Sequence, residues 1–318
     1  MSGSVYICTY IYMRKHAFLR NRTLSYRQNL LTMKKNVFHV KYDQYFSNCC
    51  GGIIYVTKMG ARKRMSSYRL WGSTEDGAIE FESLTNETLS GALEVMRTSF
   101  FTGENVSKAV GVVSEPGAVD ELIELCLDAA KDGVSVVAIE VETGDVVGAL
   151  FNKIQVPGNP TEKSSFERFS ETCKYKSSKA LVDFMIDIDS RFNIFKHYNA
   201  KCILEIMFLS VLPEYSKRRI GELLVSSSLE IARELKRGKQ AKIPVLVKDT
   251  NSIINYNAIP TLASVICTSN YSIKICVKLG FEILLNTSFD DFEIDGKKYS
   301  EILNNEHKDC CLVVKRIS

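Results

Sequence analysis

The chain has 318 residues, of which 45% are hydrophobic and 25% are charged, a composition typical of a globular protein with a core of ordinary size. No uninterrupted apolar run approaches the roughly 18 residues of a membrane-spanning helix. Ten cysteines form no CxxC pair, and only four histidines accompany them, which excludes the common zinc motifs. We therefore predict a cytoplasmic protein with reduced cysteines, no membrane segment and no metal.

The charges are distributed unevenly along the chain. The chain has 41 basic and 37 acidic residues. Residues 1–70 contain 13 of the basic residues and one of the acidic ones, so residues 71–318 contain 28 basic and 36 acidic residues. We predict that residues 1–77 form a basic, poorly ordered leader and that residues 78–318 form an acidic folded domain. An acidic body raises the local concentration of a cationic substrate, although mild acidity also serves solubility alone.

The leader permits three interpretations. An acid-poor segment that contains Arg and Ser resembles a mitochondrial transit peptide, which would direct the protein to mitochondria. Tyrosines interleaved with arginines, as from Tyr10 to Tyr26, also occur in RNA-binding arms. Alternatively, translation begins at Met59 or Met65 and the upstream residues are never made. Every clear folding signal begins after Ala78, which favours the last interpretation, and we expect no nucleic-acid partner.

Regular patterns begin with a predicted strand over residues 79–84. Apolar residues three to four apart then predict two helices, over 86–96 and 119–130. Two apolar strands follow and flank the turn 142–145, where Gly144 allows the positive φ of a tight hairpin.

The second half continues to alternate helices and strands. An amphipathic helix is predicted over 174–198, and the almost wholly apolar segment 202–211 predicts a central strand that is covered on both faces. Helices over 220–235 and 272–279 and a short strand over 243–249 follow, and two apolar segments end the chain. Together these elements predict an α/β fold.

The segment from Leu209 to Leu224 predicts a buried strand, a short loop and the start of a helix. Backbone N–H groups at a helix N-terminus bind phosphate, and the basic run 217–219 adds positive charge beside them. Gly221 allows a bulky ligand to approach the backbone closely. The same pattern also occurs in an ordinary solvated turn.

This segment resembles the acetyl-CoA motif of the GNAT N-acetyltransferase superfamily, Arg/Gln-x-x-Gly-x-Gly/Ala after a strand. Gly221 takes the last motif position, whereas Ser216 replaces the first residue and Arg219 the first glycine. Arg219 is therefore expected to weaken pyrophosphate binding. Six further stretches resemble the insect arylalkylamine N-acetyltransferases: FFTGE at 100–104, DGVSVVA at 132–138, VGALFNKI at 147–154, LSVLPEY at 209–215, CTSNYS at 267–272 and KLGFE at 278–282.

The resemblance spans residues 79–318 and implies a mixed, V-splayed central sheet flanked by helices, with acetyl-CoA entering between two central strands. It implies direct acetyl transfer to a small primary amine, an arylalkylamine, in a ternary complex without a metal. The residues expected to bind acetyl-CoA are Leu209, Ser210, Val211, Lys217, Arg218, Arg219, Ile220, Gly221 and Glu222.

Acetyl transfer requires a neutral amine and a stabilised carbonyl oxygen. An alkylamine has a pKa of roughly 10, so a base is useful at neutral pH. Glu104 matches the family glutamate that is implicated as this base, acting through water, although Asn105 stands where the family commonly has proline. Backbone N–H groups near residues 209–211 are expected to stabilise the oxyanion, because the splayed strand leaves them unpaired.

The leaving thiolate requires a proton donor. The tyrosine position that is usual in the superfamily holds Cys276, so that Tyr271, Ser272 and Cys276 are the candidates, and Ser272 matches a serine proposed to act in the insect family. Each has a structural alternative: a helix cap for Ser272, packing for Tyr271, core for Cys276 and a surface loop for Glu104.

Three functional alternatives stay open beside the arylalkylamine enzyme. They are an acetyltransferase for polyamines, one for protein amino termini, and an impaired paralogue that binds CoA without turnover. An aromatic pocket would favour arylalkylamines, and an acidic open groove would favour polyamines or amino termini. The aromatic residues expected to wall the amine pocket are Phe100, Phe101, Phe184 and Phe192.

Overall fold

The computed structural model describes residues 42–49, 52–59, 69–159, 161–247, 257–304 and 307–318. The chain divides into two compact units, residues 1–66 and 67–318.

The first unit contains an antiparallel hairpin of β1 (Tyr42–Cys49) and β2 (Gly52–Met59), which lies within the predicted leader. Residues 1–41, 50–51 and 60–68 of the leader fall outside the described ranges, and its three interpretations stay predictions.

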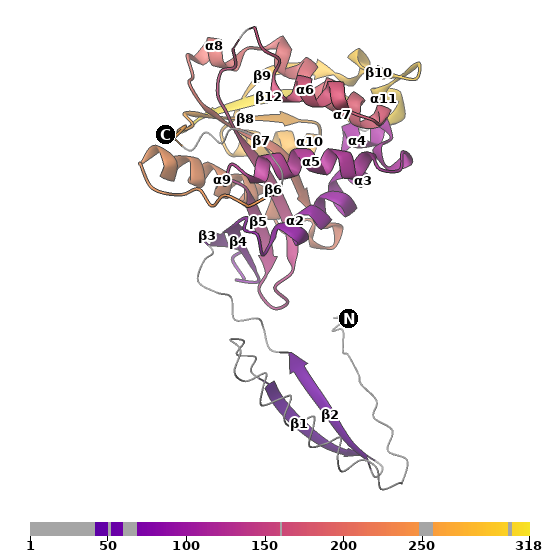
Figure 1. Ribbon diagram of the computed structural model, residues 1–318, viewed down its shortest axis with the longest axis vertical. Helices are drawn as coiled ribbons and strands as arrows, with labels where there is room; N and C mark the ends of the chain where they lie inside the picture. Colours follow the sequence, from indigo (N-terminus) through magenta and orange to yellow (C-terminus); the bar gives the residue numbers. More distant parts are fainter. Residues whose placement is uncertain (1–41, 50–51, 60–68, 160, 248–256, 305–306) are drawn as a thin grey trace. The chain divides into compact units, whose positions relative to one another are not determined.

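The second unit is built on a mixed sheet of eight strands in the order β3-β4-β5-β6-β7-β8-β12-β9 (Figure 1). β7 and β8 run parallel, whereas the other neighbouring pairs run antiparallel. The predicted mixed α/β sheet is therefore confirmed. The strands are β3 (Leu70–Ser73), β4 (Ile79–Ser83), β5 (Val136–Glu140), β6 (Val146–Gln155), β7 (Ile203–Val211), β8 (Leu262–Cys267), β9 (Glu282–Ser288) and β12 (Asp309–Arg316).

Helices cover both faces of this sheet (Figure 1). A separate small hairpin joins β10 (Glu293–Ile294) to β11 (Lys297–Lys298). The α-helices are α2 (Leu89–Val95), α3 (Phe101–Gly103), α4 (Asn105–Val110), α5 (Ala118–Ala130), α6 (Ser165–Thr172), α7 (Lys176–Arg191), α8 (Ile194–Tyr198), α9 (Ile220–Lys236), α10 (Asn270–Lys278) and α11 (Tyr299–Ile302). A π-helix, η1 (Met96–Phe100), follows α2, and 3-10 turns span η2 (Val112–Ser114), η3 (Pro213–Tyr215) and η4 (Phe289–Asp291).

Successive residues of the central strands face two different cores. In β5, Val137 and Ile139 join the core that includes α2, α5 and α7, whereas Val136 and Ala138 join the core that includes α9 and α10. Side chains alternate between the faces of a strand, so a sheet that is covered on both faces needs apolar residues at nearly every position. This requirement explains the unbroken apolar runs in the sequence.

The parallel pair β7–β8 separates partway along its length. It pairs from Ile203 opposite Leu262 to Ile206 opposite Val265, and β7 then continues to Val211 with β6 as its partner. The register between β6 and β7 shifts between Phe208 and Ile206, which is a bulge in β7. This confirms the predicted V-splay of the sheet.

Two predicted elements differ in the structure. The helix predicted over 174–198 is interrupted, because Phe192 is extended and Asn193 caps α8 by accepting a hydrogen bond from Lys196 N at 2.8 Å. The strand predicted over 243–249 is irregular as far as residue 247, where its description ends. Its backbone bonds to a loop instead of a strand, for example Ile243 N to Gly133 O at 2.8 Å.

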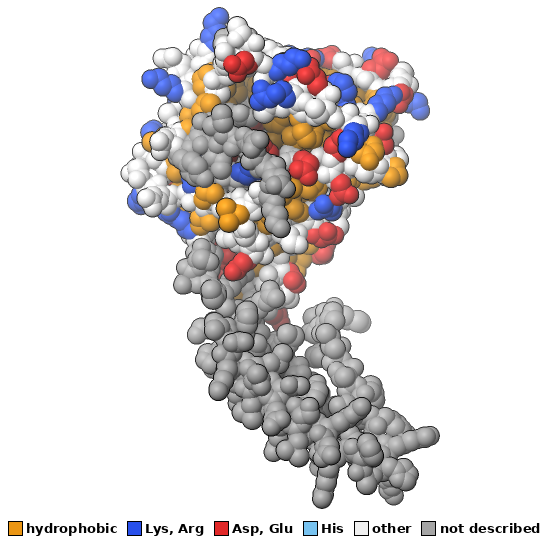
Figure 2. All heavy atoms as spheres, viewed as in Figure 1, with side chains coloured by type: hydrophobic (Ala, Val, Ile, Leu, Met, Phe, Trp, Pro, Cys, Tyr) orange, Lys and Arg blue, Asp and Glu red, His pale blue; other side chains and the backbone are white. Residues whose placement is uncertain are grey.

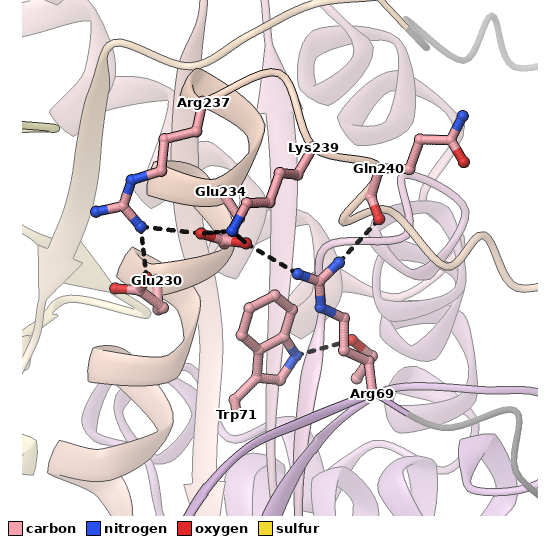
Figure 3. A network of polar contacts seen from close by, with 8 residues as sticks. Arg69, Trp71, Glu230, Glu234, Arg237, Lys239 and Gln240 are labelled. Atoms are coloured by element: carbon pink, nitrogen blue, oxygen red, sulfur yellow. Dashed lines mark hydrogen bonds and ion pairs between the residues drawn. The ribbon is translucent and has the colours of Figure 1, made fainter.

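The folded body begins before the predicted boundary at residue 78. Arg69 donates to Glu234 Oε2 at 3.1 Å and to Gln240 O at 2.8 Å, and its guanidinium lies 4.5 Å from the Trp71 ring centre (Figure 3). Trp71 in turn donates to Ser83 Oγ at 2.8 Å. These contacts and the pairing of β3 with β4 place residues 69–77 in the domain.

Gly133 tests how closely the irregular segment packs on the sheet. A Cβ there would lie 2.6–2.8 Å from backbone atoms of Ile243 and Pro244, and φ is +71°. We expect Gly133→Ala to lower the free energy of unfolding by about 2–4 kcal/mol, since both strain and overpacking contribute.

The matched control is Gly144→Ala, because φ there is +78° but no atom lies within 4 Å. It should cost about 1–2 kcal/mol, the strain alone. Urea unfolding of both variants measures the difference, and equal losses would contradict the close packing.

Candidate active site

A cavity of about 460 Å³ opens where β7 and β8 separate. Its wall includes Leu209, Ser210 and Val211 from the cofactor prediction. It also includes all four residues predicted to be catalytic, Glu104, Tyr271, Ser272 and Cys276. The fold therefore brings together residues that lie far apart in the sequence.

Two backbone N–H groups of β7 face this opening. Leu212 N donates to Val147 O of β6 at 2.9 Å, and donors alternate sides along a strand, so the N–H groups of Leu209 and Val211 point away from β6. Beyond Ile206, β8 no longer pairs with this edge. The two donors are therefore available to an oxygen atom in the cavity.

The π-helix η1 holds the same edge of β7 from the side. Ser99 Oγ donates to Val211 O at 3.0 Å and accepts from Ser210 Oγ at 2.9 Å. Phe100 packs edge-on against Phe208 with ring centres 5.4 Å apart. π-helices are rare and often mark functional sites. The amino-acid sequence shows no pattern that indicates a π-helix here, so Ser99 could not be identified from it.

The aromatic residues predicted to wall the pocket divide into three groups. Phe100 and Phe184 line the cavity, together with Phe208. Phe101 is 1% exposed and belongs to the core. Phe192 lines a second cavity.

Glu104 caps helix α4. Its carboxylate accepts hydrogen bonds from Val106 N (2.9 Å), Ser107 N (2.7 Å), Ser107 Oγ (2.8 Å) and Thr268 Oγ1 (2.6 Å). These four hydrogen bonds hold the carboxylate in one orientation at the start of α4. Glu104 therefore has a structural role whether or not it also receives a proton.

The three proton-donor candidates lie along α10. Ser272 closes a capping box with Ser269, and its hydroxyl donates to Ser269 O at 2.9 Å. Tyr271 is 69% exposed, with its ring centre 5.9 Å from that of His307. Cys276 is buried, with its sulfur 3.6 Å from that of Cys267. The hydrogen bond between the thiols and burial raise the pKa of Cys267, which therefore stays protonated.

His307 and Glu205 are among the cavity residues that were not predicted as site residues. His307 is buried, and its Nδ1 accepts a hydrogen bond from Asn270 N at 3.4 Å. Glu205 is 8% exposed on β7. A single acidic residue inside an apolar strand is costly without a purpose, and that signal was present in the sequence.

The predicted phosphate turn leads into α9, which begins at Ile220. Lys217 and Arg219 both have left-handed backbone angles, with φ of 62° and 60°. Arg219 pairs with Glu222 at 2.8 Å, and Arg218 pairs with Asp76 at 3.3 Å. Both arginine charges are therefore partly neutralised within the protein.

Two further residues of the turn have distinct environments. Hydrogen bonds from Arg219 and Lys278 lower the pKa of Glu222 to about 2, so this residue is an anion beside the helix start. A Cβ on Gly221 would meet Ile275 Cδ1 at 3.6 Å and Leu209 Cδ2 at 3.9 Å, which are ordinary contacts. The protein itself therefore does not require glycine at position 221.

Within the described ranges, no three or more His, Cys, Asp or Glu side chains are grouped so that they could hold a metal ion. In the same ranges, no helix is both long and apolar enough to cross a bilayer.

Several solved structures that are named as N-acetyltransferases share this fold, although no protein-family profile matches the chain. Arylalkylamine N-acetyltransferase 2 from Aedes aegypti aligns at 22% identity and a TM-score of 0.60, covering 76% of this chain and 99% of the other. The putative arylalkylamine N-acetyltransferase 7 of that mosquito aligns at 14% identity and a TM-score of 0.60, covering 82% of this chain and 100% of the other. The Drosophila melanogaster polyamine N-acetyltransferase aligns at 16% identity and a TM-score of 0.56, covering 75% of this chain and 99% of the other. These neighbours confirm the predicted GNAT fold.

Arg219 provides a test of strain at the phosphate turn. A left-handed backbone costs a residue with a Cβ about 1–2 kcal/mol relative to glycine. We expect Arg219→Gly to be more stable than Arg219→Ala by about 1 kcal/mol, since both lose the same ion pairs and differ only in the Cβ. Denaturant unfolding compares the two, and an equal or more stable Ala variant would rule out strain at this position.

The cap at Glu104 also predicts a loss of stability. Glu104→Ala should lower the free energy of unfolding by about 1–2 kcal/mol, because α4 loses its cap. Glu124 is exposed on α5, and Glu124→Ala should change it by no more than about 0.5 kcal/mol. Thermal unfolding distinguishes them. Similar stabilities of the two variants would mean that the cap contributes nothing.

Proposed function

We propose that this protein is an acetyl-CoA-dependent N-acetyltransferase whose acceptor is a small primary amine, with arylalkylamines as the first class to test. The observation that supports this most is the cavity at the separation of β7 and β8. Two unpaired N–H groups, two carboxylates and an aromatic wall meet there. The acetyltransferase fold of the structural neighbours supports the same reading.

In this proposal acetyl-CoA enters the opening between β7 and β8 from the side of α9. The N–H groups at the start of α9, in residues 220–222, bind the pyrophosphate, and Lys217 adds positive charge. The pantetheine lies along the open edge of β7, where residues 209–211 offer backbone partners. Gly221 leaves room for the cofactor against the helix.

The acceptor occupies the side of α7, where aromatic rings support an arylalkyl group. Phe100, Phe184 and Phe208 line this part of the cavity with Met185. Rings of this kind bury a flat apolar body and leave its amine free to reach β7.

The reaction follows from these positions. Glu104 receives the ammonium proton through water, and the neutral amine attacks the thioester carbon. The developing oxyanion accepts hydrogen bonds from the N–H groups of Leu209 and Val211. The C–N bond forms and the nitrogen gives up its second proton to solvent, the C–S bond breaks, and Tyr271, Ser272 or Cys276 protonates the leaving thiolate.

Thiol release from acetyl-CoA by the full chain tests the proposal. Tryptamine, dopamine, octopamine, spermidine and a peptide amino terminus are the acceptors to compare. Turnover of an arylalkylamine is the expected result. Binding of acetyl-CoA without turnover of any amine would refute the proposal and favour a CoA-binding paralogue.

Gly221 tests the cofactor site separately. Gly221→Ala should weaken acetyl-CoA binding about 10-fold or more, because a methyl group that crowds a ligand costs about 1–3 kcal/mol. Stability should be unchanged or slightly higher, since the added Cβ meets only ordinary contacts. Calorimetric titration measures the affinity.

Ser226→Ala, further along α9, controls for the change in helix propensity. If Gly221→Ala bound acetyl-CoA as tightly as Ser226→Ala, the cofactor would not lie against this turn.

A further inference from the structure

A second cavity of about 730 Å³ adjoins the reaction cavity, and Glu205 lines both. The second cavity lies among α6, α7, α8 and the ends of β6 and β7 that are distant from Val211. Its wall has six carboxylates but only three basic side chains. The acidic residues are Asp128, Asp132, Glu162, Glu167, Asp189 and Glu205, and the basic ones are Lys153, Lys163 and Arg168.

Glu205 is buried without a cation bonded to it in the described part of the chain. It is 8% exposed, and its carboxylate accepts a hydrogen bond from the neutral amide of Gln155, Nε2 to Oε2, at 2.6 Å. The charge of Lys153 acts on Glu205, but Lys153 is itself paired with Asp128 at 2.9 Å and Asp132 at 3.3 Å. Burial therefore raises the pKa of the Glu205 carboxyl.

One face of helix α7 is apolar beside the reaction cavity and acidic beside the second cavity. Leu181 and Met185 line the reaction cavity, and Asp189 lines the second cavity. These three residues are four apart and share one face of the helix. Asp189 is exposed and carries the same charge as the nearby Glu205. The acidic side chains of Glu205 and Asp189 thus lie beyond the end of the reaction cavity that is distant from the open edge of β7.

A buried carboxylate of this kind is costly unless a cation compensates it. Acidic and basic side chains are interspersed over the face shown in Figure 2, whereas acidic side chains outnumber basic ones in the lining of the second cavity. A positively charged group on the ligand would supply the missing partner. An arylalkylamine with a neutral ring would leave Glu205 uncompensated.

We propose that Glu205 determines acceptor specificity by binding a second positively charged group of the amine, so that the preferred acceptor is a diamine with an apolar spacer. This inference rests on the proposed acetyl transfer and identifies the class of its acceptor. Glu205 acts as a binding residue for the far end of the acceptor, and Glu104 keeps its proposed role.

The spacing along β7 fits an acceptor of this kind. Glu205 lies four residues before Leu209, which is about 13 Å of strand at about 3.3 Å per residue. The length of the Glu205 side chain shortens this span. A diamine with a spacer of several methylene groups can therefore reach Glu205 with one nitrogen while the other approaches Leu209 and Val211.

Two acceptors that differ by one ammonium group provide the test. Hexylamine and hexamethylenediamine have the same six-carbon chain, and kcat/KM is measured for both with the full-length protein. We expect the diamine to be preferred by roughly 10- to 100-fold, the range of a charged hydrogen bond. Glu205→Gln should abolish this preference, because the neutral amide no longer attracts the second ammonium group.

The pH dependence gives a second readout of the same contact. The preference should fall as the pH drops through the raised pKa of Glu205, because the protonated side chain no longer attracts the cation. Glu142→Gln, at an exposed hairpin turn, removes one negative charge outside both cavities and should keep the preference.

Each contrary result has a definite meaning. A wild-type protein without any preference for the diamine overturns the inference while acetyl transfer stands. If Glu205→Gln lowers kcat equally for both amines, Glu205 accepts the proton and does not bind a second cation.

Failure of the proposed reaction is distinguished by a binding measurement. If no amine is acetylated, calorimetry of both amines with the CoA-bound protein still tests Glu205. Tighter binding of the diamine that is lost in Glu205→Gln supports the inference, and equal binding overturns it. Denaturant unfolding at neutral pH shows that the variant folds, and its stability should equal or exceed that of wild type because a desolvated charge is removed.

Discussion

The separation of β7 from β8 after Ile206 and Val265 creates the site. A strand inside a sheet normally has both rows of backbone donors paired, so a strand that loses one neighbour presents a row of free N–H groups. Here that row faces a cavity instead of bulk water. The bulge in β7 alters the direction of the strand at this point. This one irregularity therefore determines both the opening between β7 and β8 and the direction in which the N–H groups of Leu209 and Val211 point.

The rest of the sheet keeps this opening in position. Each face has its own core, and the strands contribute alternate side chains to each. Gly148 of β6 allows Ile220 and Leu224 of α9 to pack closely, because a Cβ there would lie 3.3 Å from both. The helix that provides the proposed phosphate site is thereby fixed to the strand next to the donor row. On the other face, Ser99 ties the π-helix to Val211.

Sequence patterns predicted the elements that are long and periodic, and missed those that depend on tertiary partners. The apolar run at 202–211 is a central strand because burial on both faces demands it. β3 has four mostly exposed residues, and its place is set by the contacts of Arg69 and Trp71, which no local pattern reveals.

The splay of the sheet and the candidate catalytic positions were reached through resemblance to a family, since periodicity carries no information on either. Ser272 takes part in the capping box of α10, in keeping with its structural alternative, whereas Glu104 caps α4, a role that its sequence did not indicate. The measurement that tests the central claim most directly is amide hydrogen exchange along β7 with and without acetyl-CoA. The account predicts new protection of the Leu209 and Val211 amides and no change at Phe208 and Ser210, whose N–H groups already face β6. Unchanged exchange at Leu209 and Val211 with acetyl-CoA bound would contradict it.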